Sequence, residues 1–156
     1  MTFSAPRRLR PNDDLHQFDC GIEEMNLWLR TRATRSLSSG DAVAWGVFDD
    51  GMLAGFYALA PVSAQRGEAG GMLDRNAPEQ VPALLLARLG VDRRHQRHGL
   101  GRALVADAAE RARAAASQVG GRALLVDAKN PEVAAWYGRL GFRAFRDDQL
   151  RLYLMF

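Results

Sequence analysis

The chain has 156 residues, of which 47% are hydrophobic and 25% charged, and its formal net charge is +3. This length and composition predict one domain, residues 1–156, with a buried core, and they exclude a disordered chain. No apolar run approaches the ~18 residues of a membrane span, no secretory h-region follows the N-terminus, and the single cysteine, Cys20, excludes an internal disulfide, so we expect a cytoplasmic protein with no membrane contact.

The first half of the chain predicts a helix followed by a β-hairpin. After "FDCG", apolar residues recur at helical spacing and two glutamates occupy the first turn, where the helix dipole favours them: Ile22, Met25, Leu29 and Ala33, with Glu23 and Glu24. The opposite face of this helix carries Arg30, Arg32 and Arg35. The apolar segments 42–48 and 52–60 flank "DDG", which is typical of a hairpin turn. Residues 61–80 are rich in glycine, proline and acidic residues, which predicts a loop or short helix.

The rest of the chain alternates strands and helices. Residues 81–91 are nearly continuously apolar, as in a central strand covered on both faces, and 101–117 predict a helix closed by two glycines. A second buried strand covers 122–128, and Asn130 and Pro131 are typical of the N-cap and first residue of a helix that Gly141 ends. Residues 142–145 and 150–156 predict a hairpin, whose apolar second strand offers an edge for a homodimer. We therefore expect an α/β (α+β) domain with a mixed sheet.

The segment "VDRRHQRHGLGRAL", residues 91–104, joins the central strand to the following helix and predicts an anion site. Residues 88–113 hold seven arginines against three acidic residues, whereas 41–87 hold two against six. Backbone N–H groups and the positive end of a helix dipole favour an anion there, and glycines let it approach closely. A P-loop would need Gly-Lys-Ser/Thr, and a Rossmann loop would need a third glycine where Leu104 stands. Both of these nucleotide-binding alternatives fit poorly.

The glycine spacing, together with the segment that follows it, resembles a known family. Gln96-x-x-Gly99-x-Gly101 resembles the pyrophosphate-binding motif of the GNAT superfamily of acyl-CoA N-acyltransferases, and "LLVDAKNPEVAAWYGRLGF" supplies the strand, the asparagine and the tyrosine before "GF" that such a domain has. The resemblance covers essentially the whole chain. It implies a GNAT fold, a mixed central sheet with flanking helices whose splayed central strand binds acetyl-CoA.

Within the superfamily, the chain looks like the acetyltransferase toxins of bacterial type II toxin-antitoxin modules. The shared segments are "FDCGIEEMNLWLRTRA", "GFYALA", "PALLLARLGVDRRHQ" and "WYGRLGF". The resemblance implies transfer of acetyl to the α-amino group of aminoacyl-tRNA, which blocks translation, and neutralisation by a small ribbon-helix-helix antitoxin. Two alternatives stay open: a housekeeping N-acetyltransferase of a small-molecule amine or protein N-terminus, and a regulator that binds acetyl-CoA without catalysis. Retention of Tyr137 argues against the regulator.

The resemblance also assigns roles to single residues. Tyr137 is the candidate general acid, which would protonate the CoA thiolate, although a tyrosine that packs in the core beside Trp136 would give the same pattern. The cofactor-binding candidates are Leu89, Gly90, Val91, Gln96, Arg97, His98, Gly99, Leu100, Gly101, Arg102 and Asn130. No general base is apparent, and an α-amine, with a pKa of about 8, needs little help. Candidates for a tRNA backbone track are Arg30, Arg32, Arg35, Arg88, Arg93 and Arg94, although solvated helix faces look the same.

Two positions depart from the family pattern. Arg97 stands where glycine usually follows the glutamine, so a positive φ there would add strain, while its side chain could bind the 3′-phosphate of CoA. Gly90 replaces the usual alanine of the central strand, which we expect to weaken packing slightly. Cys20 is interpreted as a buried helix-entry residue rather than a nucleophile. His95 and His98 lack a third ligand, so no metal site is expected.

Overall fold

The computed structural model describes residues 2–33, 35 and 39–156, and it divides into two compact units. The first unit holds the described residues of Met1–Ala60 together with Arg88–Ala108, and the second holds Pro61–Ala87 and Ala109–Phe156. Strands β3 and β4 and helix α3 contribute residues to both units. The expectation of one domain over residues 1–156 therefore stays a prediction, and each unit is described by itself.

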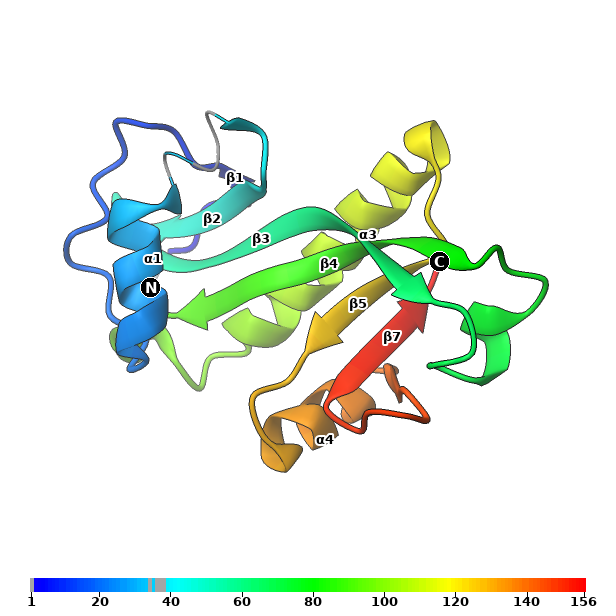
Figure 1. Ribbon diagram of the computed structural model, residues 1–156. Coiled ribbons are helices and arrows are strands. Elements are labelled where there is room, and N and C mark those ends of the chain that lie inside the picture. The colour runs from blue at the N-terminus through cyan, green and yellow to red at the C-terminus, as the bar shows by residue number, and fades with distance from the viewer. Residues whose placement is uncertain (1, 34, 36–38) are drawn as a thin grey trace. The chain divides into compact units, whose positions relative to one another are not determined.

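After the α1 helix and the β2–β3 hairpin, the described elements run β4, α3, β5, α4 and then β6 and β7, as the sequence predicts (Figure 1). The strands pair in the order β1-β2-β3-β4-β5-β7-β6 in a mixed sheet, because β4 and β5 are parallel whereas β2 with β3 and β5 with β7 are antiparallel. The strands are β1 (Arg7–Arg8), β2 (Val43–Asp49), β3 (Met52–Gln65), β4 (Gln80–Val91), β5 (Ala123–Asp127), β6 (Arg143–Ala144) and β7 (Arg151–Met155). The helices are α1 (Glu23–Thr31), α3 (Leu100–Val119) and α4 (Pro131–Arg139), with 3-10 turns η1 (Gly71–Asp74) and η2 (Arg93–His95). The predicted α/β fold class is confirmed.

In the first unit, β2 and β3 form the predicted hairpin. Their turn places Asp50 at φ 49° and Gly51 at φ 82°, the two left-handed residues that a tight hairpin of this twist requires. The sequence analysis missed β1, in which Arg7 pairs with Gly46 on the outer side of β2. Two residues carry no alternating pattern, so nothing in the sequence marked this strand.

Helix α1 closes the apolar side of the first unit and is shorter than predicted. Trp28 stacks on Phe56 of β3 with ring centroids 6.0 Å apart, and Leu29 is almost fully buried. The helix ends at Thr31, and Arg32 is its C-cap. The predicted helix is therefore interrupted at Arg32, and Arg35, which is again helical, lies beyond the end of α1.

The second unit is built around β5, which pairs with β4 on one side and with β7 on the other (Figure 1). Its core includes Leu73, Val81, Leu125 and Phe145. The predicted C-terminal hairpin is confirmed, but β7 lies between β5 and β6 rather than at the edge of the sheet. The suggestion of a dimer edge at β7 was therefore wrong in its placement.

The segment predicted as a loop or short helix, residues 61–80, is partly strand. β3 continues to Gln65, the short turn η1 follows, and β4 begins at Gln80. The continuation of β3 carries Pro61 and small residues that alternate between buried and exposed positions, a pattern weaker than the apolar run before it. Among the described residues, no helix is long and apolar enough to cross a membrane.

Candidate functional site

The loop after β4 has two halves. The anchored half is residues 92–96, and the open half is residues 97–99. Asp92 caps the turn η2 by accepting a hydrogen bond from the Arg94 backbone N–H. The chain then adopts left-handed φ values at Arg97 (65°) and Gly99 (76°) before α3 begins at Leu100. The expected strain at position 97 is therefore present, since a non-glycine residue rarely adopts positive φ.

The side chain of Asp92 organises the anchored half. It is 1% exposed, and its carboxylate accepts hydrogen bonds from Arg94 Nε at 2.9 Å and from the Asp19 backbone N–H at 3.1 Å, with His95 Nδ1 3.2 Å away. Burial alone would raise the pKa of Asp92, but the hydrogen bonds from the Arg94 side chain and from the Asp19 and Arg94 backbones outweigh it and lower the pKa to about 2. The loop is therefore held by an ionised, buried carboxylate, which the sequence analysis missed.

The "FDCG" segment supplies the surface against which this half is fixed. The Arg93 backbone N–H donates to the Asp19 carbonyl oxygen at 2.8 Å. The Asp19 side chain accepts from the Gly21 backbone N–H and from Asn26 Nδ2, both at 2.8 Å, and Asn26 Oδ1 accepts from the Cys20 backbone N–H. Asn26 is buried, so this opening motif is a folded support for the loop. Cys20 is buried, as interpreted from the sequence.

Gln96 faces the protein rather than the open half of the loop. Its Nε2 donates to the backbone oxygen of Val91 at 3.0 Å and to that of Cys20 at 3.4 Å. The side chain thus closes the anchored half onto the end of β4. Its contribution to cofactor binding stays a prediction.

The open half has the features of an anion site. Arg97, His98 and Gly99 are exposed, and a Cβ added at Gly99 would meet no described atom within 4 Å. The first N–H groups of α3 have no partner within the helix, and 20 residues of aligned peptide dipoles stand behind them. Leu100 and Gly101 open this helix, with Arg102 exposed in its first turn. A backbone of this form suits an anion, and its identity as the pyrophosphate-binding site stays a prediction.

The unusual glycine of β4 has a packing reason. A Cβ at Gly90 would lie 2.8 Å from Met25 Sδ, 3.1 Å from Phe56 Cε1 and 3.4 Å from Phe18 Cζ. The expectation that Gly90 loosens the strand was therefore wrong, because these side chains already fill the space beside it. Its neighbours Leu89 and Val91 are half-buried.

The six candidate tRNA-binding arginines differ in how free their side chains are. Arg94 is committed to Asp92 and to the Gln17 carbonyl oxygen, whereas Arg93 lies 3.7 Å from Asp19 in an exposed pair. Arg88 stacks over the Trp28 ring at 5.1 Å.

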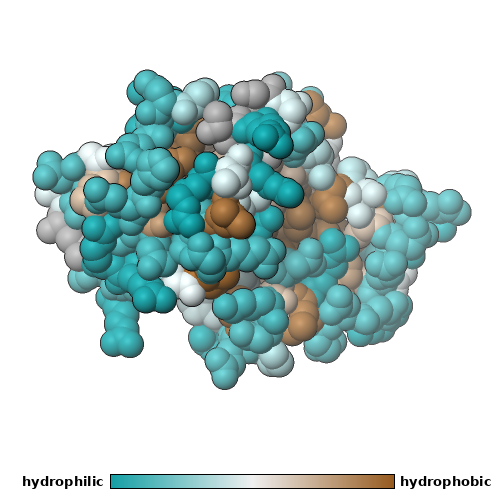
Figure 2. Space-filling model, turned by 60° about the vertical axis from the view of Figure 1, so that its left-hand side comes forward, coloured by the Kyte–Doolittle hydropathy of each residue, from teal (hydrophilic) through white to brown (hydrophobic). Residues whose placement is uncertain are grey.

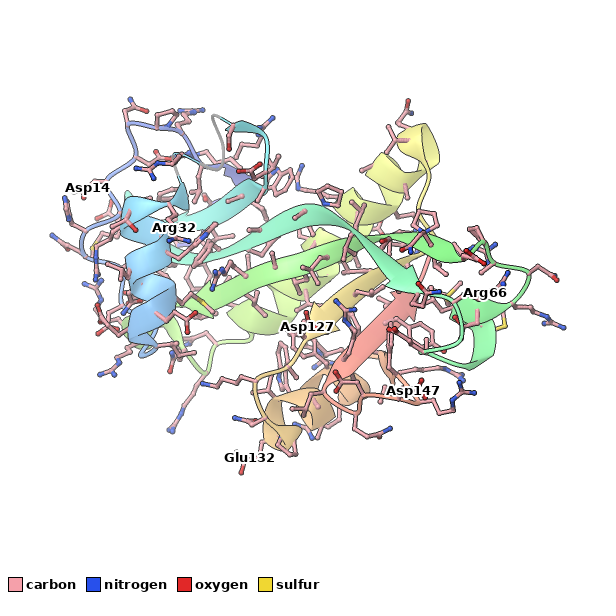
Figure 3. The ribbon with its side chains drawn as sticks, in the orientation of Figure 1. Asp14, Arg32, Arg66, Asp127, Glu132 and Asp147 are labelled. Carbon is pink, nitrogen blue, oxygen red and sulfur yellow. The ribbon has the colours of Figure 1, made fainter. Side chains whose placement is uncertain are left out.

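The other three arginines lie on α1 or beyond its end. Arg30 pairs with Glu23 at 2.8 Å. Arg32 and Arg35 are exposed, Arg32 at the end of α1 (Figure 3). The face in Figure 2 is mostly hydrophilic, with small separate apolar patches.

The second unit holds the remaining two candidates, each at one end of α4. Asn130 caps the helix, its Oδ1 accepting from the Val133 backbone N–H at 2.8 Å, and Pro131 follows as the first helical residue, with Glu132 beside it (Figure 3). Tyr137 is buried, its ring edge-to-face with Trp136 at 4.9 Å and with Phe142 at 5.3 Å. Burial raises the pKa of the Tyr137 phenol, so it carries its proton at neutral pH. The capping role is confirmed, and the catalytic role stays a prediction.

Three polar residues of the loop and its support escaped the sequence analysis: Asp92, Asn26 and Asp49. An aspartate directly after an apolar strand is a signal that could have identified Asp92 as a cap. Asp49 accepts a hydrogen bond from the Thr2 backbone N–H and has His95 Nε2 3.0 Å from its other oxygen. Within the described part of the chain, no group of three or more His, Cys, Asp or Glu residues could hold a metal ion.

The fold and the loop after β4, here called the glycine loop, together define a class of enzyme. Comparison with known proteins gives the same class. Residues 11–142 match the acetyltransferase (GNAT) family, and the chain belongs to this family. It is an acyl-CoA-dependent N-acetyltransferase whose cosubstrate is acetyl-CoA.

Several individual proteins are similar to this chain over nearly its whole length. The chain is 40% identical over 153 residues to a tRNA-acetylating toxin of Mycobacterium tuberculosis, with 98% of this chain and 92% of the relative covered. It superposes with a TM-score of 0.89 and 27% identity on AtaT in complex with acetyl-methionyl-tRNAfMet, covering 99% and 95% of the two chains. A tyrosine-to-phenylalanine variant of AtaT, bound to the C-terminus of the antitoxin AtaR and acetyl-CoA, matches with a TM-score of 0.82 and 26% identity over 98% and 92%.

Proposed function

We propose that this enzyme is a toxin that transfers acetyl from acetyl-CoA to the α-amino group of aminoacyl-tRNA and so blocks translation. The observation that carries the proposal is the 40% identity, over nearly the whole chain, to a toxin that acetylates tRNA. The glycine loop adds a site of suitable form for the pyrophosphate of the cosubstrate. A substantial fraction of the free α-amine of an aminoacyl ester is neutral at physiological pH. Such an amine suits a site without an apparent general base.

The proposed reaction is an aminolysis of the thioester. The amine nitrogen attacks the acetyl carbonyl carbon, the C–S bond breaks, and the amine gives up one proton while the CoA thiolate gains one. Tyr137 donates that proton as general acid, and the proton lost by the amine restores the phenol through solvent. The buried, protonated state of Tyr137 supports this role.

The proposed roles of the other candidates follow their exposure. Backbone groups of Leu89 and Val91 pair with the pantetheine amides, Arg97 to Arg102 bind the pyrophosphate, and Gln96 fixes the loop. Arg32, Arg35, Arg88 and Arg93 contact the tRNA backbone, while Arg30 and Arg94 contribute less because Glu23 and Asp92 already occupy them. The antitoxin is a small ribbon-helix-helix protein, and the enzyme is cytoplasmic and homodimeric.

The deciding experiment incubates the purified protein with radiolabelled acetyl-CoA and total charged tRNA. We expect label on the RNA, released by mild base as an N-acetyl amino acid, and none on uncharged tRNA. Label on small amines or on peptide N-termini instead would favour a housekeeping acetyltransferase. A protein that binds acetyl-CoA but consumes none with any amine would be a regulator.

The proposed partners have separate tests. The gene directly upstream should encode the small antitoxin, and its product should co-purify with this chain and relieve growth arrest. Light scattering after size exclusion should give twice the monomer mass. A monomer, or an upstream gene of another kind, would remove the corresponding part of the proposal.

A further inference from the structure

The histidine of the loop lies between two carboxylates from different parts of the first unit. His95 is 5% exposed, with Nδ1 3.2 Å from Asp92 Oδ1 and Nε2 3.0 Å from Asp49 Oδ2. The Phe3 ring lies beside the imidazole with its centroid 6.0 Å away. Asp92 stands at the start of the loop and Asp49 at the end of β2, so the imidazole connects the loop to the β2–β3 hairpin.

The arrangement limits which hydrogens the ring can carry. A neutral imidazole has one N–H and one lone pair, so it would turn a lone pair toward one of the two carboxylates. Both contacts are favourable only when both ring nitrogens carry hydrogen. Asp92 and Asp49 are ionised: burial raises the pKa of Asp92 but the hydrogen bonds from Arg94 and the Asp19 backbone outweigh it, and the hydrogen bond from the Thr2 backbone N–H lowers the pKa of Asp49.

We infer that His95, as an imidazolium bridging Asp92 and Asp49, is a positioning residue that holds the glycine loop in the conformation that binds acetyl-CoA. The bridge ends one residue before Gln96 and two before the left-handed turn at Arg97, where the open half begins. Fixing this point lowers the entropy that the loop would otherwise lose when it closes around the pyrophosphate. Loss of the bridge therefore weakens acetyl-CoA binding without touching a group that contacts the cofactor.

The first test reads the charge directly. Nitrogen NMR of the ¹⁵N-histidine-labelled protein at neutral pH should show both ring nitrogens of His95 protonated, assigned through the His95→Gln variant, with exposed His16 and His98 as internal comparisons. A His95 ring with one unprotonated nitrogen overturns the inference, whatever the variants do.

The second test measures acetyl-CoA dissociation constants by titration calorimetry, which needs no acceptor amine, so failure of the proposed tRNA substrate would leave it interpretable. We expect Asp49→Asn to weaken binding about three- to tenfold with little change in thermal stability. Asp50→Asn, at the next residue in the hairpin turn, is the matched control and should bind like the wild type.

A double-mutant cycle separates the bridge from other effects of Asp49, which also accepts from the Thr2 backbone N–H. In a His95→Gln background, Asp49→Asn should change binding by less than about twofold. An undiminished effect in that background would assign the role to the Thr2 contact and overturn the inference. Equal binding of acetyl-CoA by the Asp49→Asn variant and the wild type would do so as well.

Discussion

The side-chain amide of Gln96 donates a hydrogen bond to the backbone oxygen of Val91 at 3.0 Å, so the residue that marks the cofactor motif holds its own loop against the preceding strand. We predict that Gln96→Ala weakens acetyl-CoA binding about fivefold, since one hydrogen bond of this kind contributes about 1 kcal/mol. Gln96→Glu should weaken it further, because a carboxylate would face two carbonyl oxygens. Titration calorimetry measures the dissociation constants for acetyl-CoA. A Gln96→Glu variant that binds as tightly as the wild type would contradict the role of Gln96 in holding the loop.

Gly90 and Gly138 should respond to alanine in opposite directions. Gly90→Ala places a methyl group against Met25 and Phe56 and should cost about 1–2 kcal/mol of unfolding free energy. Gly138 lies in α4 with nothing within 4 Å of an added Cβ, so Gly138→Ala should stabilise by about 0.5–1 kcal/mol. Urea unfolding measures both, and a neutral Gly90→Ala would show that Met25 moves aside without cost.

We predict that Arg97 lowers the unfolding free energy and contributes to recognition of the cofactor. Arg97→Gly relieves the left-handed strain and should raise the unfolding free energy by up to about 1 kcal/mol. If the guanidinium binds the 3′-phosphate of CoA, the same variant should lose most of the preference for acetyl-CoA over acetyl-dephospho-CoA. Arg113→Ala, an exposed arginine of α3, is the control. A variant that weakens binding of both cofactors equally would place the 3′-phosphate elsewhere.

Asp92 should make the protein sensitive to acid. Its pKa is about 2 in the folded chain and about 3.9 in an unfolded one, so it contributes about 2 kcal/mol above pH ~4. Because the folded value is the lower one, this contribution falls as the pH drops through about 2. Asp92→Asn should therefore be less stable than the wild type at neutral pH and approach it in acid. A difference in unfolding free energy that stays constant with pH would contradict the assignment, and Asp50→Asn is the control.

Tyr137→Phe tests the proposed general acid. The change removes one hydroxyl and should lower kcat roughly 10²- to 10⁴-fold while the dissociation constant for acetyl-CoA stays the same. Tyr153→Phe makes the same chemical change at a buried tyrosine of β7 and should leave kcat unaltered. In cells, the wild type should arrest growth and the Tyr137→Phe variant should not. If kcat of the Tyr137→Phe variant is unchanged, Tyr137 is not the general acid and only packs beside Trp136.

Most of the fold could be predicted because its signals are local. Asp-Gly at the β2–β3 turn, Asn130 and Pro131 at the start of α4, and the apolar run of β4 all act through neighbours in the sequence. β1 could not be predicted, because two residues have no periodicity and the strand exists only through pairing with β2. The end of α1 was missed because the apolar spacing continues past Thr31 to the buried Ala33.

The sequence by itself determined the family, the glycine loop and the residues available for chemistry, since spacing and backbone preference are properties of short segments. The tertiary structure decided what those residues do. Asp92 meets the Asp19 backbone 73 positions away, and His95 meets Asp49 46 positions away. Gly90 is closely packed because Met25 and Phe56 fill the space beside it. Hydrogen bonding and packing depend on distances in space, and only the folded chain brings these partners within reach.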